Sequence, residues 1–72
     1  MPGVLRAPNL RDLRLRNRLT QKGLAEKAGV AFTSIINLEQ GGAARFQTIR
    51  RLAEALDVPD EELGEPAPKG AS

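Results

Sequence analysis

Short polar side chains gather in one stretch of this 72-residue sequence, the segment FTSIINLEQ that begins at Phe32. Thr33, Ser34 and Asn37 supply hydroxyl and amide groups, which both donate and accept hydrogen bonds. Such groups suit DNA base edges: asparagine can bond adenine at two atoms, and apolar side chains contact the thymine methyl group. The segment has no Glu, Lys or Arg before Glu39, although an ordinary solvent-facing helix prefers them. The composition therefore favours a helix that reads bases.

Enzyme chemistry has little support in this composition. The sequence contains no His and no Cys, so zinc ligands, thiolate nucleophiles and the usual general base are missing. Ser34, Ser72 and the three Thr residues lack an obvious base that could activate their hydroxyl groups. We therefore expect no enzyme, no metal site and no cofactor.

The apolar residues and the amino end argue against a membrane protein. The longest apolar runs are a few residues, far below the ~20 residues of a membrane-spanning helix. The first ten residues, MPGVLRAPNL, lack the apolar segment of a signal peptide. Together with the lack of Cys, these features predict a cytoplasmic protein that does not enter a membrane.

The net charge of +2 hides an uneven distribution of charged residues. Residues 1–30 contain seven Lys or Arg against two acidic residues, a net charge of +5, whereas residues 31–72 contain four against seven, a net charge of −3. A basic half beside an acidic half favours a surface that faces a polyanion such as nucleic acid. A solvated basic helix without a partner fits these numbers equally well.

Two helices joined by a glycine turn must position the polar segment. The stretch 21–40 holds two sets of residues at helical spacing: Leu24, Ala25 and Ala28 in the first, and Ile35 and Leu38 in the second. Gly29 between them tolerates the positive φ that ends a helix abruptly. On its own, a helix pair broken by a glycine favours two helices that merely pack inside an all-α domain. The polar residues left exposed on the second helix instead favour a helix-turn-helix, which places its second helix in the DNA major groove.

The whole chain is predicted to be all-α, a compact bundle of about five short helices without a β-sheet. We expect helices at 10–18, 21–28, 32–39, about 46–56 and 60–63, with Asn9 and Thr20 as N-caps. The predicted core consists of Leu13, Leu24, Ala25, Val30, Ile35, Leu38, Ile49, Leu52, Ala53 and Leu56. Residues 1–8 are expected to form an irregular arm, 9–63 the folded domain and 64–72 a disordered tail, with GGAAR at 41–45 as a loop.

Three segments of the sequence resemble the phage repressor and Cro type of helix-turn-helix regulator, the XRE family. They are LTQKGLAEKAGV, SIINLEQG and TIRRLAEALDV, and the resemblance runs from about Leu10 to Leu63. It implies a lambda-repressor-like DNA-binding domain. It also implies that Gln21 contacts a phosphate, that Arg14 and Glu39 form a structural ion pair, and that the positions of Phe32, Thr33 and Asn37 reach bases.

The sequence departs from the family at three places. Phe32 and Ile36 are apolar where the family usually has polar residues, and the loop 41–45 is short. Phe32 is therefore expected either to contact a thymine methyl group or to contact no base. Ile36 is a candidate for a contact with a partner protein. Arg45 is a candidate for a minor-groove or phosphate contact, at even odds with a solvated loop side chain.

These observations predict a sequence-specific double-stranded DNA-binding transcription regulator, with a repressor as the favoured direction. Its DNA-binding residues are expected to be Gln21, Phe32, Thr33, Ser34, Ile36, Asn37 and Arg45. We expect a homodimer on two half-sites ~34 Å apart, because one helix reads only a few base pairs. The alternative is an antitoxin or other protein-interaction module that binds a partner protein through Phe32 and Ile36, or through the acidic carboxyl-terminal part.

Overall fold

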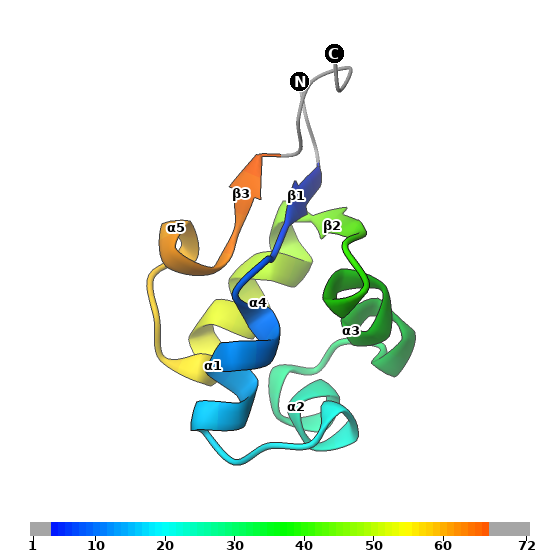
Figure 1. The fold of residues 1–72 in the computed structure, drawn as a ribbon, viewed down its shortest axis with the longest axis vertical. Helices are drawn as coiled ribbons and strands as arrows, with labels where there is room; N and C mark the ends of the chain where they lie inside the picture. The colour runs from blue at the N-terminus through cyan, green and yellow to red at the C-terminus, as the bar shows by residue number, and fades with distance from the viewer. Residues whose placement is uncertain (1–3, 67–72) are drawn as a thin grey trace.

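Five helices and three short strands make up residues 4–66, the part of the chain that the computed structural model describes (Figure 1). The helices are α1 (Leu10–Arg16), α2 (Gln21–Ala28), α3 (Phe32–Glu39), α4 (Phe46–Leu56) and α5 (Asp60–Leu63). The strands are β1 (Val4–Arg6), β2 (Ala43–Arg45) and β3 (Glu65–Pro66). The predicted bounds of the last four helices are confirmed, whereas α1 ends two residues earlier than expected.

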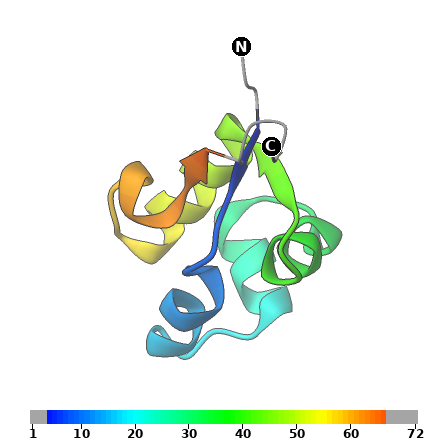
Figure 2. The ribbon, with the colours of Figure 1, turned by 45° about the horizontal axis from the view of Figure 1, so that its top comes forward.

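The expectation of a chain without a β-sheet is wrong. The three strands form an antiparallel sheet in the order β2-β1-β3, so β1 lies between segments from the middle and the end of the chain (Figure 2). In this sheet Leu5 is opposite Ala44 on one side and Pro66 on the other. Strands of two or three residues are too short to show the alternating pattern of a half-buried strand, so the sequence gives no signal for them.

The sheet also corrects the expected boundaries of the domain. Residues 4–6 of the expected arm, residues 43–45 of the expected loop and residues 65–66 of the expected tail are all strands of the folded body. The remaining residues of the arm and the tail, 1–3 and 67–72, lie outside the described residues.

An aliphatic core joins the helices. Nine of the ten predicted core residues are buried, and the tenth, Val30, is half-buried. Ala7, Leu10 and Leu63 are buried as well, so both ends of the helical region contribute to the core. Full burial of a Leu or Ile side chain stabilises a fold by ~1.5–3 kcal/mol relative to exposure. Among the described helices none is long and apolar enough to cross a membrane.

The ends of α2 follow the predicted chemistry. The hydroxyl of Thr20 accepts a hydrogen bond from the backbone N–H of Gly23 at 2.8 Å, which satisfies one free donor of the first turn. A side chain at position 23 would bring its Cβ to 3.0 Å from that hydroxyl, which explains the glycine inside the helix. Gly29 has a φ of 71° and ends α2 in the left-handed conformation.

Asn9 does not cap α1, contrary to expectation. No side-chain hydrogen bond caps that helix, and the amide of Asn9 instead donates to the backbone oxygen of Glu62 at 3.1 Å. The side chain thereby joins the start of α1 to α5, a contact between residues that are distant in the sequence.

Candidate nucleic-acid interface

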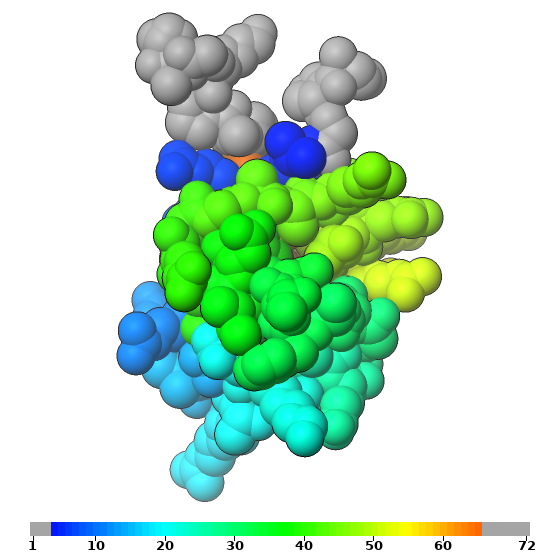
Figure 3. Space-filling view, turned by 90° about the vertical axis from the view of Figure 1, so that its right-hand side faces the viewer, coloured from blue at the N-terminus to red at the C-terminus, as the bar shows by residue number. Residues whose placement is uncertain are grey.

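Helix α3 buries one face and leaves the other to solvent. Ile35 and Leu38 are fully or almost fully buried, and α3 packs on α2 and α1. On the outer face, Phe32, Thr33 and Asn37 are exposed, and Ser34 and Ile36 are partly exposed. Figure 3 looks onto this side of the molecule, with α3 in the middle, α2 below it and the first turns of α4 above it. The outer face of α3 is thus open to solvent on this side of the molecule.

A charged pair fixes the end of α3 to α1. Arg14 donates from Nε to Glu39 Oε2 at 2.6 Å and from Nη2 to Glu39 Oε1 at 3.0 Å, in a bidentate arrangement. The two side chains are only 10% and 7% exposed. Arg14 Nη1 also donates to the backbone oxygen of Leu19 at 2.9 Å. The pair therefore holds α1, the following loop and α3 together.

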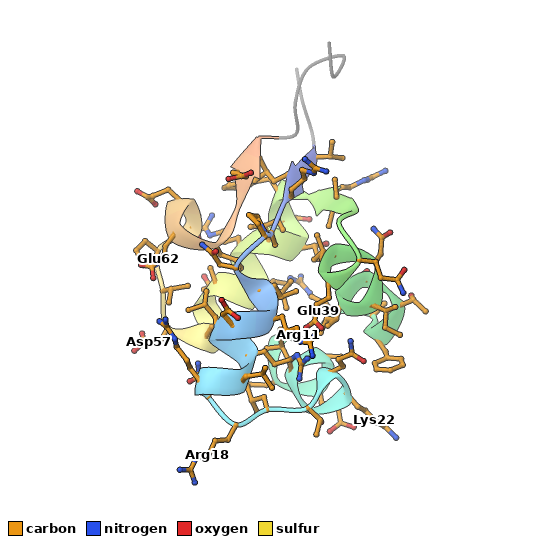
Figure 4. All side chains as sticks on the ribbon, in the orientation of Figure 1. Arg11, Arg18, Lys22, Glu39, Asp57 and Glu62 are labelled. Atoms are coloured by element: carbon orange, nitrogen blue, oxygen red, sulfur yellow. The ribbon has the colours of Figure 1, made fainter. Side chains whose placement is uncertain are left out.

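The electrostatics of this pair follow from its partners. Burial alone would raise the pKa of Glu39, but hydrogen bonds from Arg14 and Gln21 and the charges of Arg14 and Arg11 outweigh it, so the pKa is lowered. The hydrogen bond with Glu39 raises the pKa of Arg14 against the opposing effect of burial. Figure 4 shows Arg11 beside Glu39 between α1 and α3. Both members of the pair are charged at neutral pH.

Gln21 joins this cluster from the first residue of α2. Its amide Nε2 donates to Glu39 Oε1 at 3.0 Å, so that this oxygen accepts hydrogen bonds from both Gln21 and Arg14. The side chain is half-buried. Gln21 is thus oriented by a carboxylate that is itself fixed.

The side chain of Asn37 is folded back onto the chain that follows α3. Its Nδ2 donates to the backbone oxygen of Ala43 at 3.1 Å, and its own backbone oxygen accepts from the N–H of Gly42 at 2.8 Å. A Cβ built at Gly42 would lie 2.4 Å from Asn37 Oδ1, so the glycine makes room for the amide. Asn37 therefore joins α3 to β2, and the pair of glycines after the helix was the only sequence signal of this contact.

The remaining predicted residues lie around α3. Arg45 is exposed at the end of β2, directly before α4 and opposite Val4 of β1. Ser34 faces a hollow of about 330 Å³ between the turn and the start of α4, which Gln47, Thr48 and Arg51 also line.

Two basic residues, Arg51 beside the turn and Lys22 at the start of α2, were not among the predicted site residues. Arg51 Nη1 donates to the backbone oxygen of Gly29 at 3.3 Å and so holds the turn against α4. Lys22 projects from α2 on the side where α3 lies, whereas Asp57 and Glu62 lie on the opposite side (Figure 4). Its position directly after Gln21, at the start of α2, was enough to make Lys22 a candidate for the same interface.

A comparison with models of known protein families shows that residues 10–63 match the helix-turn-helix family. The chain belongs to the helix-turn-helix family. It is also similar to the HTH-type transcriptional repressor RghR of Bacillus subtilis (strain 168), with 43% identity over 56 residues. That match covers 75% of this chain and 42% of the relative, so the chain spans less than half of the relative's length. The comparison with solved structures gave no match.

Proposed function

We propose that this helix-turn-helix protein is a sequence-specific double-stranded DNA-binding transcription regulator that acts as a repressor in the cytoplasm. The observation that carries the proposal is the outer face of α3, on which Phe32, Thr33 and Asn37 are exposed, while the inner face is fixed by the core and by Glu39. A helix fixed in this way after a tight glycine turn has the geometry that enters the major groove. The name of the 43% identical relative, a transcriptional repressor, supports the direction of regulation.

Phosphate contacts would set the register of the protein on DNA. An amide nitrogen carries two hydrogens, and Gln21 Nε2 uses one of them for Glu39. The second hydrogen is available to a phosphate oxygen next to the first turn of α2, whose early N–H groups also suit an anion. Arg45, exposed beyond α3, supplies a positive charge to the backbone on the other side.

Base contacts would come from Phe32, Thr33 and Asn37, with Ser34 and Ile36 at the edges of the contact. Asn37 keeps its Oδ1 as an acceptor, but a two-atom bond to adenine requires Nδ2 to leave Ala43. One such helix covers only a few base pairs. We therefore also propose a homodimer that places two copies of α3 about 34 Å apart on one side of the DNA.

Selection of DNA fragments from a random pool by the purified protein tests this function. Sequencing of the bound fragments should yield a short motif that occurs twice, with the centres of the halves about one helical turn apart. If no DNA fragment is enriched, and a pull-down instead captures a partner protein that binds through Phe32 and Ile36, the proposal of a DNA-binding regulator fails. The chain would then be a protein-interaction module.

A further inference from the structure

We propose that Phe32 recognises the C5-methyl group of a pyrimidine, in unmodified DNA the methyl group of thymine, and is thereby the main specificity-determining residue of α3. The inference rests on the proposed function, in which α3 lies in the major groove. It names the chemical group that the helix reads there.

The polar side chains of α3 have fewer free groups than the sequence implies. Asn37 Nδ2 is bonded to the backbone of Ala43, and Ser34 is half-buried beside the hollow at the start of α4. Thr33 is left as the polar side chain that is exposed on the outer face without a hydrogen bond among those found in residues 4–66. Discrimination between bases by hydrogen bonds is therefore limited on this helix.

The apolar side chains of α3 occupy the place where bases are read. Phe32 is the first residue of α3 and is 44% exposed, and Ile36 lies one turn further along the same face. In a helix-turn-helix the amino-terminal residues of the second helix contact base edges. A phenyl ring neither donates nor accepts conventional hydrogen bonds, and the apolar group that the major groove offers it is the thymine methyl. A 5-methylcytosine presents the same methyl group.

Two of the acidic side chains lie away from α3, where they would not repel a DNA backbone at Phe32. Lys22 projects on the side of α3, and the acidic residues Asp57 and Glu62 lie on the far side of the molecule (Figure 4). The second phenylalanine, Phe46, is equally exposed at 47% but lies at the start of α4, so it provides a matched control.

Substitution of single thymines by deoxyuridine in the selected DNA removes one methyl group at a time and leaves the hydrogen-bonding groups unchanged. When deoxyuridine replaces the thymine that Phe32 contacts, we expect the wild-type protein to bind the fragment about fourfold more weakly. This factor corresponds to ~0.8 kcal/mol for the burial of one methyl carbon. Phe32→Ala should bind the thymine fragment more weakly and should no longer distinguish it from the deoxyuridine fragment. Phe46→Ala should retain the fourfold difference, and circular dichroism checks that both variants are folded.

Cytosine at the same position provides a second measurement. C5-methylation of that cytosine should strengthen wild-type binding, and the gain should disappear in Phe32→Ala. If deoxyuridine at every thymine leaves wild-type affinity unchanged, methyl reading is overturned while DNA binding stands. If Phe32→Ala still distinguishes the fragments, another side chain reads the methyl and the assignment to Phe32 fails. A protein that selects no DNA fragment overturns both the proposed function and this inference.

Discussion

Glu39 is the residue through which side chains of α1 and α2 are tied to α3. Its carboxylate accepts hydrogen bonds from two nitrogens of Arg14 and one nitrogen of Gln21. Removal of two charges from water costs free energy, which only good geometry and additional hydrogen bonds offset. All three donors are in place here, so the buried pair orients α1, α2 and α3 relative to one another rather than leaving a charge without a partner.

The lowered pKa of Glu39 makes folding sensitive to acid. Since the folded protein holds this carboxyl below its ordinary value of 4.5, protons bind more readily to the unfolded chain. The stabilisation is fully present above the unfolded pKa and is lost as pH falls through the folded pKa. Urea unfolding of Glu39→Gln should show ~1–3 kcal/mol lower stability at pH 7 and a weaker decline below pH ~4.5 than the wild type.

Glu54→Gln is the control for this pH series. Glu54 lies 3.7 Å from Arg50, and both side chains are more than 60% exposed. Such exposed pairs contribute ~0–1 kcal/mol, so this variant should follow the wild-type curve. An acid profile of Glu39→Gln that coincides with the wild-type profile would exclude Glu39 as a source of the acid sensitivity.

Gln21 should contribute to affinity without contributing to sequence preference. Gln21→Ala removes the amide that we propose contacts a phosphate, and phosphates carry no base information. Binding to the selected fragment and to unrelated DNA should weaken by the same factor, and the salt dependence should stay nearly unchanged because the side chain is neutral. Arg45→Ala should lower the salt slope by about one unit. Binding titrations at several salt concentrations measure the affinity and the salt slope of each variant. If Gln21→Ala changes the ratio of the affinities for the selected fragment and for unrelated DNA, the phosphate role of Gln21 is contradicted.

At the scale of elements, Asn37 and Gly42 hold the chain between α3 and β2 in place. Gly42→Ala should cost ~0.5–1.5 kcal/mol, because the new methyl group displaces the Asn37 amide and breaks its hydrogen bond to Ala43. Asn37→Ala should cost ~0.5–1.5 kcal/mol for the lost hydrogen bond. In the Asn37→Ala background the alanine at position 42 has room, so the double variant should be more stable than the sum of the two effects predicts.

Urea unfolding of the four proteins in this cycle gives the coupling directly. Additive effects would mean that the amide does not pack on Gly42 in solution. Any loss of DNA binding in Asn37→Ala should then be compared with its loss of stability, since Asn37 also joins α3 to β2.

The helices were predictable because their signals are local. Thr20, Gly29 and the apolar positions of α4 each specify a helix end or a buried face within a few residues, and all appear in the structure as expected. The strands were not predictable, because Leu5 forms one only when residues 44 and 66 pair with it.

The same division holds for the candidate site. The exposed face of α3 follows from the helical spacing of Ile35 and Leu38, so the sequence was enough to place Phe32 and Thr33 outside. The bond from Asn37 to Ala43 depends on the path of the chain after Gly41, which has a φ of 96°. That path is a tertiary property that no short pattern contains.

At the scale of the whole molecule, stability depends on a small aliphatic core. Leu52 of α4 is completely buried, and Leu52→Ala should cost ~2–5 kcal/mol. A domain of this size has only ~5–15 kcal/mol in total at best, so much of the protein should lose its helical circular dichroism at moderate temperature. Leu15→Ala is the matched control because Leu15 is 53% exposed on α1. Equal stability of the two variants would mean that α4 does not form the centre of the core.

Because β1 lies between β2 and β3, the domain is suited to insertion into another protein. Leu5 and Pro66 are opposite each other on neighbouring strands, and neighbouring strands are about 4.8 Å apart, so the chain enters and leaves the fold at one point. Figure 1 shows both described ends at the top of the molecule, while the outer face of α3 points to the side. We therefore expect that the unit can be spliced into a surface loop of an unrelated protein, or closed into a ring by a short linker, without blocking α3.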